Sequence, residues 1–174
     1  KEDKYFQKVR NFVLVSNKLA VESMAEKARE LGLKAIILST KMYDEIKISL
    51  ERIFQAQEEN AVVLTAGEPT IKVKKNSGIG GRNLHIGLQA IQTGMLGENS
   101  VFLSFASDGM DNSDAAGVIA DKNTMDKISK LGLDVNDYAN RFDSYNFFQK
   151  TGDIIITGPT GANVSDLMLL LTKK

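Results

Sequence analysis

Short apolar runs alternate with segments of helical periodicity along the N-terminal part of the chain. Residues 11–16, 34–39 and 61–65 are rich in Val, Ile, Leu and Phe, and each run has the length of a buried strand. Between them, apolar residues recur at helical spacing over 17–31 and 44–58. This β-α-β-α-β alternation predicts a largely parallel sheet with right-handed crossovers.

The pattern changes after the third run, and glycine-rich loops then separate the predicted elements. Residues 68–73 alternate like a half-exposed strand that follows too closely for a crossover helix, so it bends away or pairs antiparallel. The remaining elements are helices at 82–92 and 123–131, a short helix or turn at 143–148, and strands at 101–105, 153–157 and 167–171. Because only a loop joins the last two strands, we expect them to be antiparallel.

These elements predict a mixed α/β fold in which a mostly parallel sheet is flanked by helices. Its start is Rossmann-like, and its C-terminal strands are antiparallel. A chain of 174 residues can bury a core without disulfides or metals, and no linker interrupts it. We therefore expect residues 1–174 to form one domain.

The composition narrows the classes of partner. The chain has 22 Lys and Arg residues against 22 Asp and Glu residues, whereas a dedicated nucleic-acid binder normally has a basic excess. The absence of cysteine excludes thiolate nucleophiles, disulfides and cysteine-based zinc sites, and it fits a cytoplasmic protein. No apolar run has the length of a membrane span. We therefore expect neither nucleic acid nor a membrane as a partner.

Three of the apolar runs end in loops rich in Gly, Thr, Asp and Asn, and a fourth such loop opens a helix. The loops cover residues 65–70, 107–117, 157–163 and 77–83. Ligands of open α/β sheets bind beyond the carboxyl ends of strands, where glycine lets backbone donors approach a ligand closely. The pattern therefore indicates one composite polar site.

The loop Gly78-Ile-Gly-Gly-Arg-Asn83 leads into a predicted helix. The amides of Gly80 and Gly81 at the positive end of the helix dipole offer an anion site, and Arg82 adds a fork of donors for carboxylate or phosphate. The loop has neither the Gly-Lys-Ser/Thr of a Walker A motif nor the third glycine of a dinucleotide fingerprint. A flexible helix start with a solvated arginine is the structural alternative.

Three carboxylates, those of Asp108, Asp111 and Asp114, lie in one short loop. They could hold magnesium, which usually takes one or two carboxylates plus substrate phosphates, or they could bind substrate hydroxyl groups. Each could instead stabilise the loop through an Asx turn, and Asp114 could cap a helix. Their spacing does not match an EF-hand.

The loop Thr157-Gly-Pro-Thr-Gly-Ala-Asn163 carries further polar groups. Thr160, Gly161 and Asn163 could cradle a phosphate, or the loop could be an ordinary connection between strands. Glu68 follows a predicted strand and could be an acid/base group, a carboxylate directed at a metal or a turn residue. His85 is the single histidine, and we expect it to be exposed near the start of its helix without a catalytic role.

Five blocks of sequence follow one another in order across most of the chain. They are Gly67-Glu-Pro-Thr70, Gly78-Ile-Gly-Gly-Arg-Asn83, Ala106-Ser-Asp-Gly-Met-Asp-Asn-Ser-Asp-Ala-Ala-Gly117, Asp143-Ser-Tyr-Asn-Phe-Phe148 and Thr157-Gly-Pro-Thr-Gly-Ala-Asn-Val-Ser-Asp-Leu167. Together they resemble the MOFRL domain, the C-terminal half of the glycerate kinases that make 2-phosphoglycerate. The chain departs from the family pattern at Leu84-His85, where Gln-Glu is typical, and at Asp111-Asn-Ser-Asp114, where the loop is shorter.

The resemblance implies the C-terminal domain of a two-domain, ATP-dependent glycerate kinase, with the active site between this domain and an N-terminal domain. It implies ATP and Mg²⁺ as cofactors and glycerate as the substrate. On this basis we expect Arg82, Asp108 and Asp111 to be catalytic, with Asp108 and Asp111 also as metal ligands. The expected substrate- or phosphate-binding residues are Gly80, Gly81, Asn83, Thr160, Gly161, Asn163, Glu68 and Asp114.

Two other functions remain open at the level of sequence. One is an oxidoreductase acting on hydroxypyruvate, a label that such sequences have often carried, although no dinucleotide fingerprint is present here. The other is a non-catalytic docking module, acting alone, as a subunit or as a homo-oligomer. Binding of reduced nicotinamide cofactor or of MgATP separates the two enzymes, and dimerisation without ligand binding favours the docking module.

Overall fold

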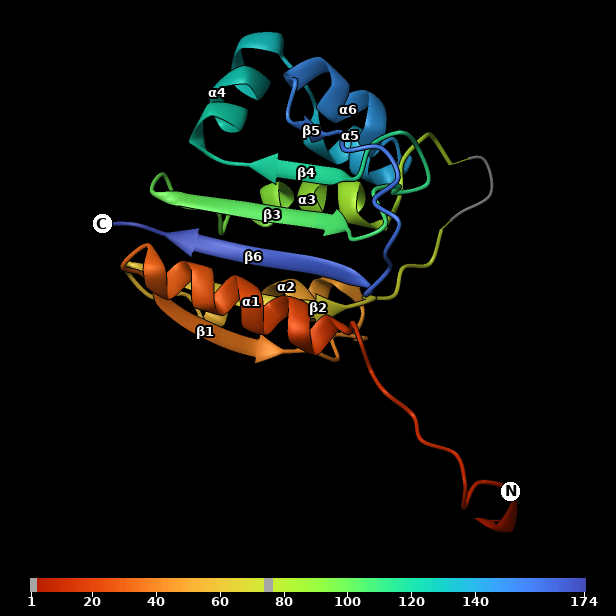
Figure 1. The fold of residues 1–174 in the computed structure, drawn as a ribbon. Helices are drawn as coiled ribbons and strands as arrows, with labels where there is room; N and C mark the ends of the chain where they lie inside the picture. The colour runs from red at the N-terminus through yellow and green to blue at the C-terminus, as the bar shows by residue number, and fades with distance from the viewer. Residues whose placement is uncertain (1–2, 74–76) are drawn as a thin grey trace.

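The structure is a computed structural model that describes residues 3–73 and 77–174. Within these residues the chain forms one six-stranded sheet with the strand order β1-β2-β6-β3-β4-β5 (Figure 1). The strands are β1 (Lys34–Ser39), β2 (Ala61–Gly67), β3 (Ser100–Ala106), β4 (Gly117–Ala120), β5 (Ile154–Ile155) and β6 (Asp166–Thr172). The mixed α/β architecture predicted from the sequence is confirmed.

Helices cover both faces of the sheet. In chain order the helices are the short 3-10 helix η1 (Asp3–Tyr5), which lies away from the sheet (Figure 1), α1 (Asn17–Glu30), α2 (Ile46–Gln55), α3 (Arg82–Gln92), α4 (Lys122–Leu131), α5 (Val135–Asn140) and α6 (Ser144–Thr151). Helix α1 packs on one face, against β1, β2 and β6, whereas α3 packs on the other face, against β3 and β4. No helix of the described residues is long and apolar enough to cross a membrane.

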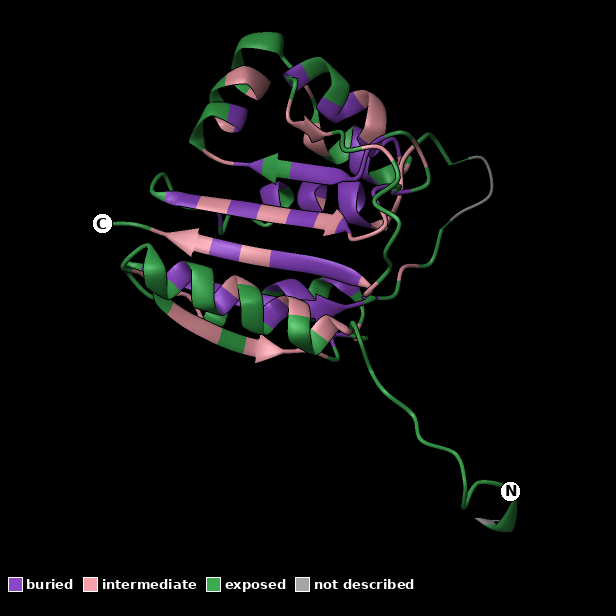
Figure 2. Cartoon of the chain, in the orientation of Figure 1, coloured by how far each residue is buried: buried purple, intermediate pink, exposed green. Residues whose placement is uncertain are grey.

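The two faces of β2 show how the core is divided. Val62 and Leu64 point to the face covered by α1, and Val63 points to the opposite face, where α2 and α3 pack. This alternation is the two-residue period of a strand buried on both sides. All seven residues of β2 are buried, so the centre of the sheet lies inside the molecule (Figure 2).

The prediction of a mostly parallel sheet is wrong. Strands β1 and β2 are parallel, but β2 with β6, β6 with β3, β3 with β4 and β4 with β5 are antiparallel. Strands β2 and β3 still point in the same direction, as the crossover through α3 requires. The C-terminal strand β6 lies between them, and a pairing between elements so distant in sequence leaves no local signal.

Two predicted strands are absent from the described structure. Residues 11–16 form an extended segment without sheet pairing, and its apolar side chains are exposed (Figure 2). Residues 68–73 also form no strand, and Thr70 makes only an isolated parallel bridge with Glu45. Its amide donates to the carbonyl of Asp44 at 2.9 Å. The alternation over 68–73 therefore belongs to a segment that pairs with the residues at the start of α2 and does not join the sheet.

Other differences concern the C-terminal half. Strand β4 and helix α5 were not predicted, because four and six residues give too short a periodic signal. The helix considered after Asp114 is instead the loop into β4. Strands β5 and β6 do run in opposite directions, but β4 and β3 lie between them. The remaining helices and strands agree with prediction to within a few residues at their ends.

Leu170 offers a direct test of the central position of β6, because its side chain is fully buried. We expect Leu170→Ala to lower the free energy of unfolding by about 2–5 kcal/mol, since it removes buried methyl groups and leaves a cavity. Leu131→Ala, at a leucine that is 53% exposed, is the matched control and should change it by less than about 0.5 kcal/mol. Equal effects in urea unfolding would contradict the position of β6 in the core.

Candidate functional site

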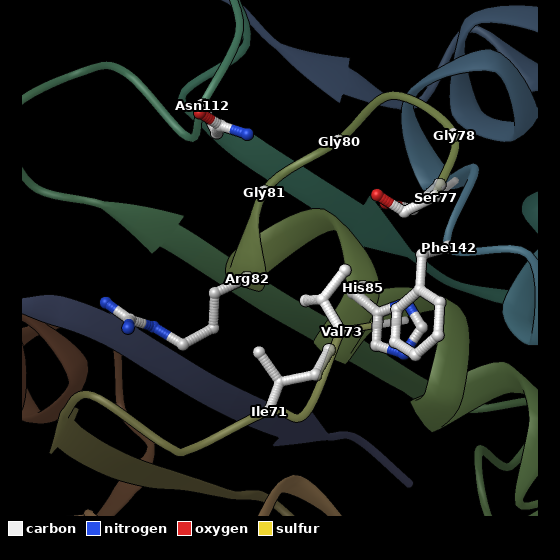
Figure 3. A pocket seen from close by; sticks show the side chains of 11 residues that line it. Ile71, Val73, Ser77, Gly78, Gly80, Gly81, Arg82, His85, Asn112 and Phe142 are labelled. Carbon is white, nitrogen blue, oxygen red and sulfur yellow. The ribbon is translucent and has the colours of Figure 1, made fainter. Parts of the chain in front are cut away.

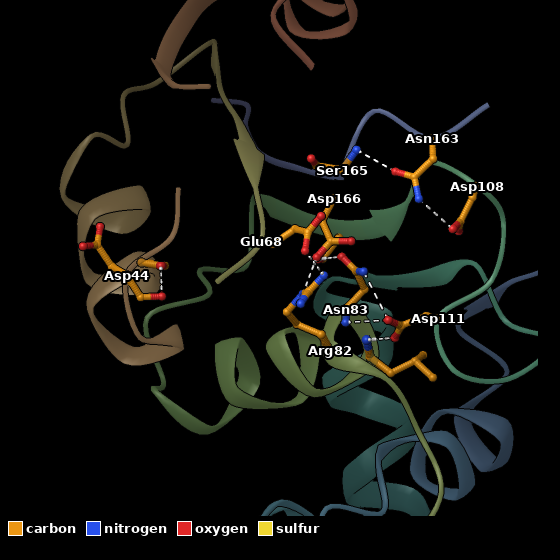
Figure 4. A network of polar contacts seen from close by, with 12 residues as sticks. Asp44, Glu68, Arg82, Asn83, Asp108, Asp111, Asn163, Ser165 and Asp166 are labelled. Atoms are coloured by element: carbon orange, nitrogen blue, oxygen red, sulfur yellow. Dashed lines mark hydrogen bonds and ion pairs between the residues drawn. The ribbon is translucent and has the colours of Figure 1, made fainter. Parts of the chain in front are cut away.

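The strand order brings three polar loops to one end of the sheet. Glu68 directly follows β2, Asp108 follows β3, and Asn163 precedes β6, which lies between these two strands. The loops line a cavity of about 190 Å³, which we call the acidic cavity. Figure 4 shows polar contacts among several of its lining residues. Its lining residues are Glu68, Arg82, Ala106, Ser107, Asp108, Met110, Asn163, Ser165 and Asp166. The prediction that these loops form one polar site is consistent with this arrangement.

Arg82 is the cation of the acidic cavity, and two carboxylates fix its position. Its Nε donates to Asp166 Oδ2 at 2.5 Å, and a terminal nitrogen lies 3.3 Å from Glu68 Oε2. Burial lowers the pKa of Arg82, but the hydrogen bond and the charge of Asp166 outweigh this effect and raise the pKa. The guanidinium therefore stays charged, with part of its donor fork already occupied.

Asp166 was not singled out from the sequence, although it is part of the last of the five blocks. Its side chain is only 6% exposed at the start of β6. Burial raises the pKa of Asp166, and the ion pair with Arg82 opposes that rise. A buried charge is rare unless it is paired, so a carboxylate at the first position of an apolar strand was the available signal.

Asp111 caps the N-terminus of α3 from a distant loop. Its Oδ1 accepts from the backbone amide of Asn83 at 3.0 Å, and its Oδ2 accepts from the amide of Leu84 at 2.8 Å. These are two of the donors that a helix start leaves without an intrahelical partner, and a negative charge is favourable there. A Cβ at Gly81 would collide with Asp111, so the close approach of the two loops requires glycine.

Asn83 and Asp111, which were predicted as substrate-binding and catalytic or metal-ligating residues, both lie buried at the start of α3. Asn83 is fully buried, and its side-chain oxygen accepts from Ser104 Oγ at 2.6 Å. Its side-chain nitrogen donates to Asp111 Oδ1 at 3.2 Å. Asp111 is 5% exposed and already accepts from three N–H groups. Both residues therefore lie beneath the surface of the site, where their hydrogen bonds join the start of α3 to the loop after β3.

A second cavity lies on the other side of Arg82, along the glycine loop. We call it the glycine-loop cavity; its volume is about 280 Å³ (Figure 3). It is lined by Ile71, Val73, Ser77, Gly78, Gly80, Gly81, Arg82, His85, Asn112, Phe142 and Ser144. Among the described residues, the backbone amides of Gly80, Gly81 and Arg82 have no hydrogen-bond partner. Free amides at a helix start suit an oxyanion.

The expectation that His85 is exposed is wrong. The residue is only 3% exposed, and its ring stacks on Phe142 with centroids 4.8 Å apart. Gln89 Nε2 lies 3.0 Å from His85 Nε2, within hydrogen-bond distance, whereas His85 Nδ1 is buried without a hydrogen-bond partner among the described residues. Burial lowers the pKa of His85 to about 4. The sequence could not show this, because Phe142 is far away along the chain.

The other predicted residues lie at different distances from the cavities. Asp108 Oδ2 accepts from Asn163 Nδ2 at 3.0 Å, which joins two loops across the acidic cavity. Thr160 is exposed and donates its hydroxyl to the Ser107 carbonyl at 2.6 Å, and Gly161 lies next to it. Asp114 is apart from both cavities and accepts from the hydroxyl of Tyr145 at 2.7 Å. The described residues contain no group of three or more His, Cys, Asp or Glu side chains that could hold a metal ion.

The buried, neutral His85 makes stability depend on pH. Because its pKa is about 4 in the folded chain and near 6.5 when unfolded, the folded state loses stability as the pH falls from about 6.5 to about 4. The loss should approach about 3 kcal/mol at the acid end of this window. We expect His85→Gln to flatten this dependence in urea unfolding at a series of pH values. An unchanged slope in the variant would show that other groups cause the dependence.

Comparison with known proteins matches this chain to one family and to glycerate kinases of two organisms. The MOFRL family model matches residues 61–166. The chain is 32% identical to a glycerate 2-kinase of Pyrococcus horikoshii, over 94% of this chain and 39% of that protein. It is 35% identical to a D-glycerate 2-kinase of Thermotoga maritima, over 82% of this chain and 36% of that protein. The chain thus spans about 40% of the length of these relatives.

Two crystal structures have the same fold. One, of a Pyrococcus horikoshii protein, superposes with a TM-score of 0.87 at 32% identity and covers 97% of this chain and 41% of that chain. The other, of the glycerate kinase of Thermotoga maritima, superposes with a TM-score of 0.82 at 32% identity and covers 90% of this chain and 40% of that chain. The sequence match over more than half of its length shows that this chain belongs to the MOFRL family.

Proposed function

We propose that this chain forms one wall of the active site of a glycerate 2-kinase, which transfers the γ-phosphate of ATP to the 2-hydroxyl group of glycerate. Family membership and the names of two similar proteins support the reaction. The observation that carries the proposal is the acidic cavity, where loops from three adjacent strands surround one fixed arginine. Phosphoryl transfer needs such positioning and charge neutralisation more than covalent chemistry from the protein.

The residues of the acidic cavity have the properties that the reaction needs. As the 2-hydroxyl oxygen bonds to the γ-phosphorus, the bond to the ADP oxygen breaks and the hydroxyl proton must leave. Asp108 and Glu68 are carboxylates that can accept this proton, and neither is fully buried. The guanidinium of Arg82 can neutralise charge on the transferred phosphoryl group or on the glycerate carboxylate.

The glycine-loop cavity supplies a second kind of donor. The free amides of Gly80 and Gly81 lie directly before the start of α3, where a phosphate or carboxylate oxygen is favoured. Arg82 lines both cavities, so a ligand that extends from one to the other passes its side chain. Asn163 lines the acidic cavity, Thr160 and Gly161 belong to the same loop before β6, and all three are proposed to contact substrate.

Magnesium fits the donors of the acidic cavity. Mg²⁺ prefers oxygen ligands and usually takes one or two carboxylates together with substrate phosphates. Asp108 would hold the ion together with substrate phosphates, because Asp111 is already occupied by N–H groups, and Glu68 would then remain to accept the hydroxyl proton. When bound, the ion would neutralise phosphate charge. We further propose that this chain is part of a longer, cytoplasmic protein. The rest of that protein would complete the site.

Arg82 provides the test of this assignment in the complete enzyme. We expect Arg82→Ala to lower kcat by about 100-fold or more, because it removes a fixed charge at the reacting phosphate. Arg82→Lys should restore part of the loss, since the cation remains while the fork is lost. Arg29→Ala, on the exposed face of α1, is the control and should leave kcat unchanged. Unchanged kcat in folded Arg82→Ala would remove the residue from the mechanism.

Ligand binding separates the kinase from the alternatives. In an amide NMR titration of this chain, MgATP or glycerate should shift the signals of Arg82, Asp108 and Asn163 together. Shifts caused by reduced nicotinamide cofactor at the same residues would favour an oxidoreductase. Dimerisation of the chain with no ligand response at these residues would favour a docking module and contradict the proposed function.

A further inference from the structure

The segment that precedes α1, residues 3–15, extends away from the body of the molecule (Figure 1). We call it the arm. Four consecutive apolar side chains in it are almost fully exposed: Phe12 is 79%, Val13 73%, Leu14 85% and Val15 64% exposed. Such a run at the surface is unusual for a soluble domain and marks an interaction site.

The backbone of Phe12–Val15 also lacks partners. Among the described residues, the amides and carbonyls of Phe12–Val15 make no hydrogen bond, and the bond of the arm that is closest to them runs from the Val9 amide to the Phe6 carbonyl at 2.9 Å. A run of Phe, Val and Leu residues that is apolar on both faces is typical of a strand covered on both sides. The segment therefore has the sequence of a buried strand, but it pairs with no other strand of the described residues.

The sheet of this chain cannot accept the arm beside its free edge at β1. Helix α2 connects β1 to β2 and packs on the face of Val63, whereas α1 packs on the opposite face, with Val62 and Leu64. Because β-α-β crossovers are right-handed, a strand before α1 would have to lie on the β2 side of β1. That side is already occupied by β2 itself. Pairing at the free edge would require a left-handed crossover, so the partner sheet lies elsewhere.

The arm leaves the molecule at the end of the sheet that carries the candidate site. Ser16 caps α1 by accepting from the Leu19 amide at 3.2 Å, and Asn17 donates to the carbonyl of Thr40, just after β1, at 2.8 Å. These contacts hold the start of α1 at the carboxyl end of β1, next to the carboxyl end of the parallel strand β2 (Figure 1). A partner bound to the arm would lie near the acidic cavity.

We propose that Phe12–Val15 is a β-strand added to the edge of a sheet in the further part of the chain that the longer relatives have. The inference rests on the proposed function, which requires a second part to complete the site. The match to the Pyrococcus horikoshii structure covers 97% of this chain, so it reaches into the arm, and more than half of that longer chain lies outside the match. Strand addition supplies backbone hydrogen bonds and buries alternate side chains.

Hydrogen–deuterium exchange tests the pairing without reference to activity. In the complete enzyme we expect the amides of Phe12–Val15 to exchange at least 100-fold more slowly than in the 174-residue chain alone, where they should exchange as in an unfolded peptide. Equal, fast exchange in both samples would overturn the proposal. Protection in the 174-residue chain alone would also overturn it, because the partner would then be its own sheet or, if protection rises with concentration, a second copy.

Variants test whether the side chains of the arm are buried against the partner sheet in the complete enzyme. Leu14→Asp in the complete enzyme should abolish the protection of Phe12 and Val13, while Leu131→Asp, at an exposed leucine of α4, should leave it intact. Persistent protection in Leu14→Asp would contradict burial of the arm. A kinase assay on the same samples separates the two proposals: protection without kinase activity refutes only the function, and activity without protection refutes only the docking.

Discussion

The contact between the carboxylate of Asp111 and the first turn of α3 is the constraint on which the candidate site depends. It joins the loop after β3 to the start of a helix that follows β2, and it satisfies two backbone donors at 3.0 and 2.8 Å. Asn83 extends this connection to β3 through Ser104. Because Arg82 is the first residue of the same helix, fixing the helix start also fixes the cation between the two cavities.

The position of β6 completes the arrangement. This strand enters the sheet between β2 and β3 and places Asp166 beside Arg82, 2.5 Å from its Nε. Removing either partner would leave a charge in a poorly solvated position, which is costly. The same geometry brings the loop before β6 next to the loop after β3, where Asn163 bonds to Asp108. The insertion of this strand thus brings residues between Glu68 and Asp166 together around one polar site.

The sequence predicted what depends on local pattern and missed what depends on distant partners. Helix α3 was predicted at its observed ends because glycine precedes it and apolar residues recur within it. The insertion of β6 could not be predicted, since the partners of a strand are not encoded in its own periodicity. His85 is buried by a ring from another segment, and Asp111 was recognised as important but not as a helix cap. Residues 11–16 have the pattern of a strand, but they pair with no strand of the described residues.

The most direct test of the organising role of Asp111 is amide hydrogen exchange at the start of α3, together with urea unfolding, in Asp111→Ala. The matched control is Asp114→Ala, which changes an exposed carboxylate of the same loop. We expect Asp111→Ala to accelerate exchange at Asn83 and Leu84 and to lower the free energy of unfolding by about 3 kcal/mol, because two buried donors lose their acceptor. Asp114→Ala should change neither quantity appreciably. Unchanged exchange and stability in Asp111→Ala would contradict the account.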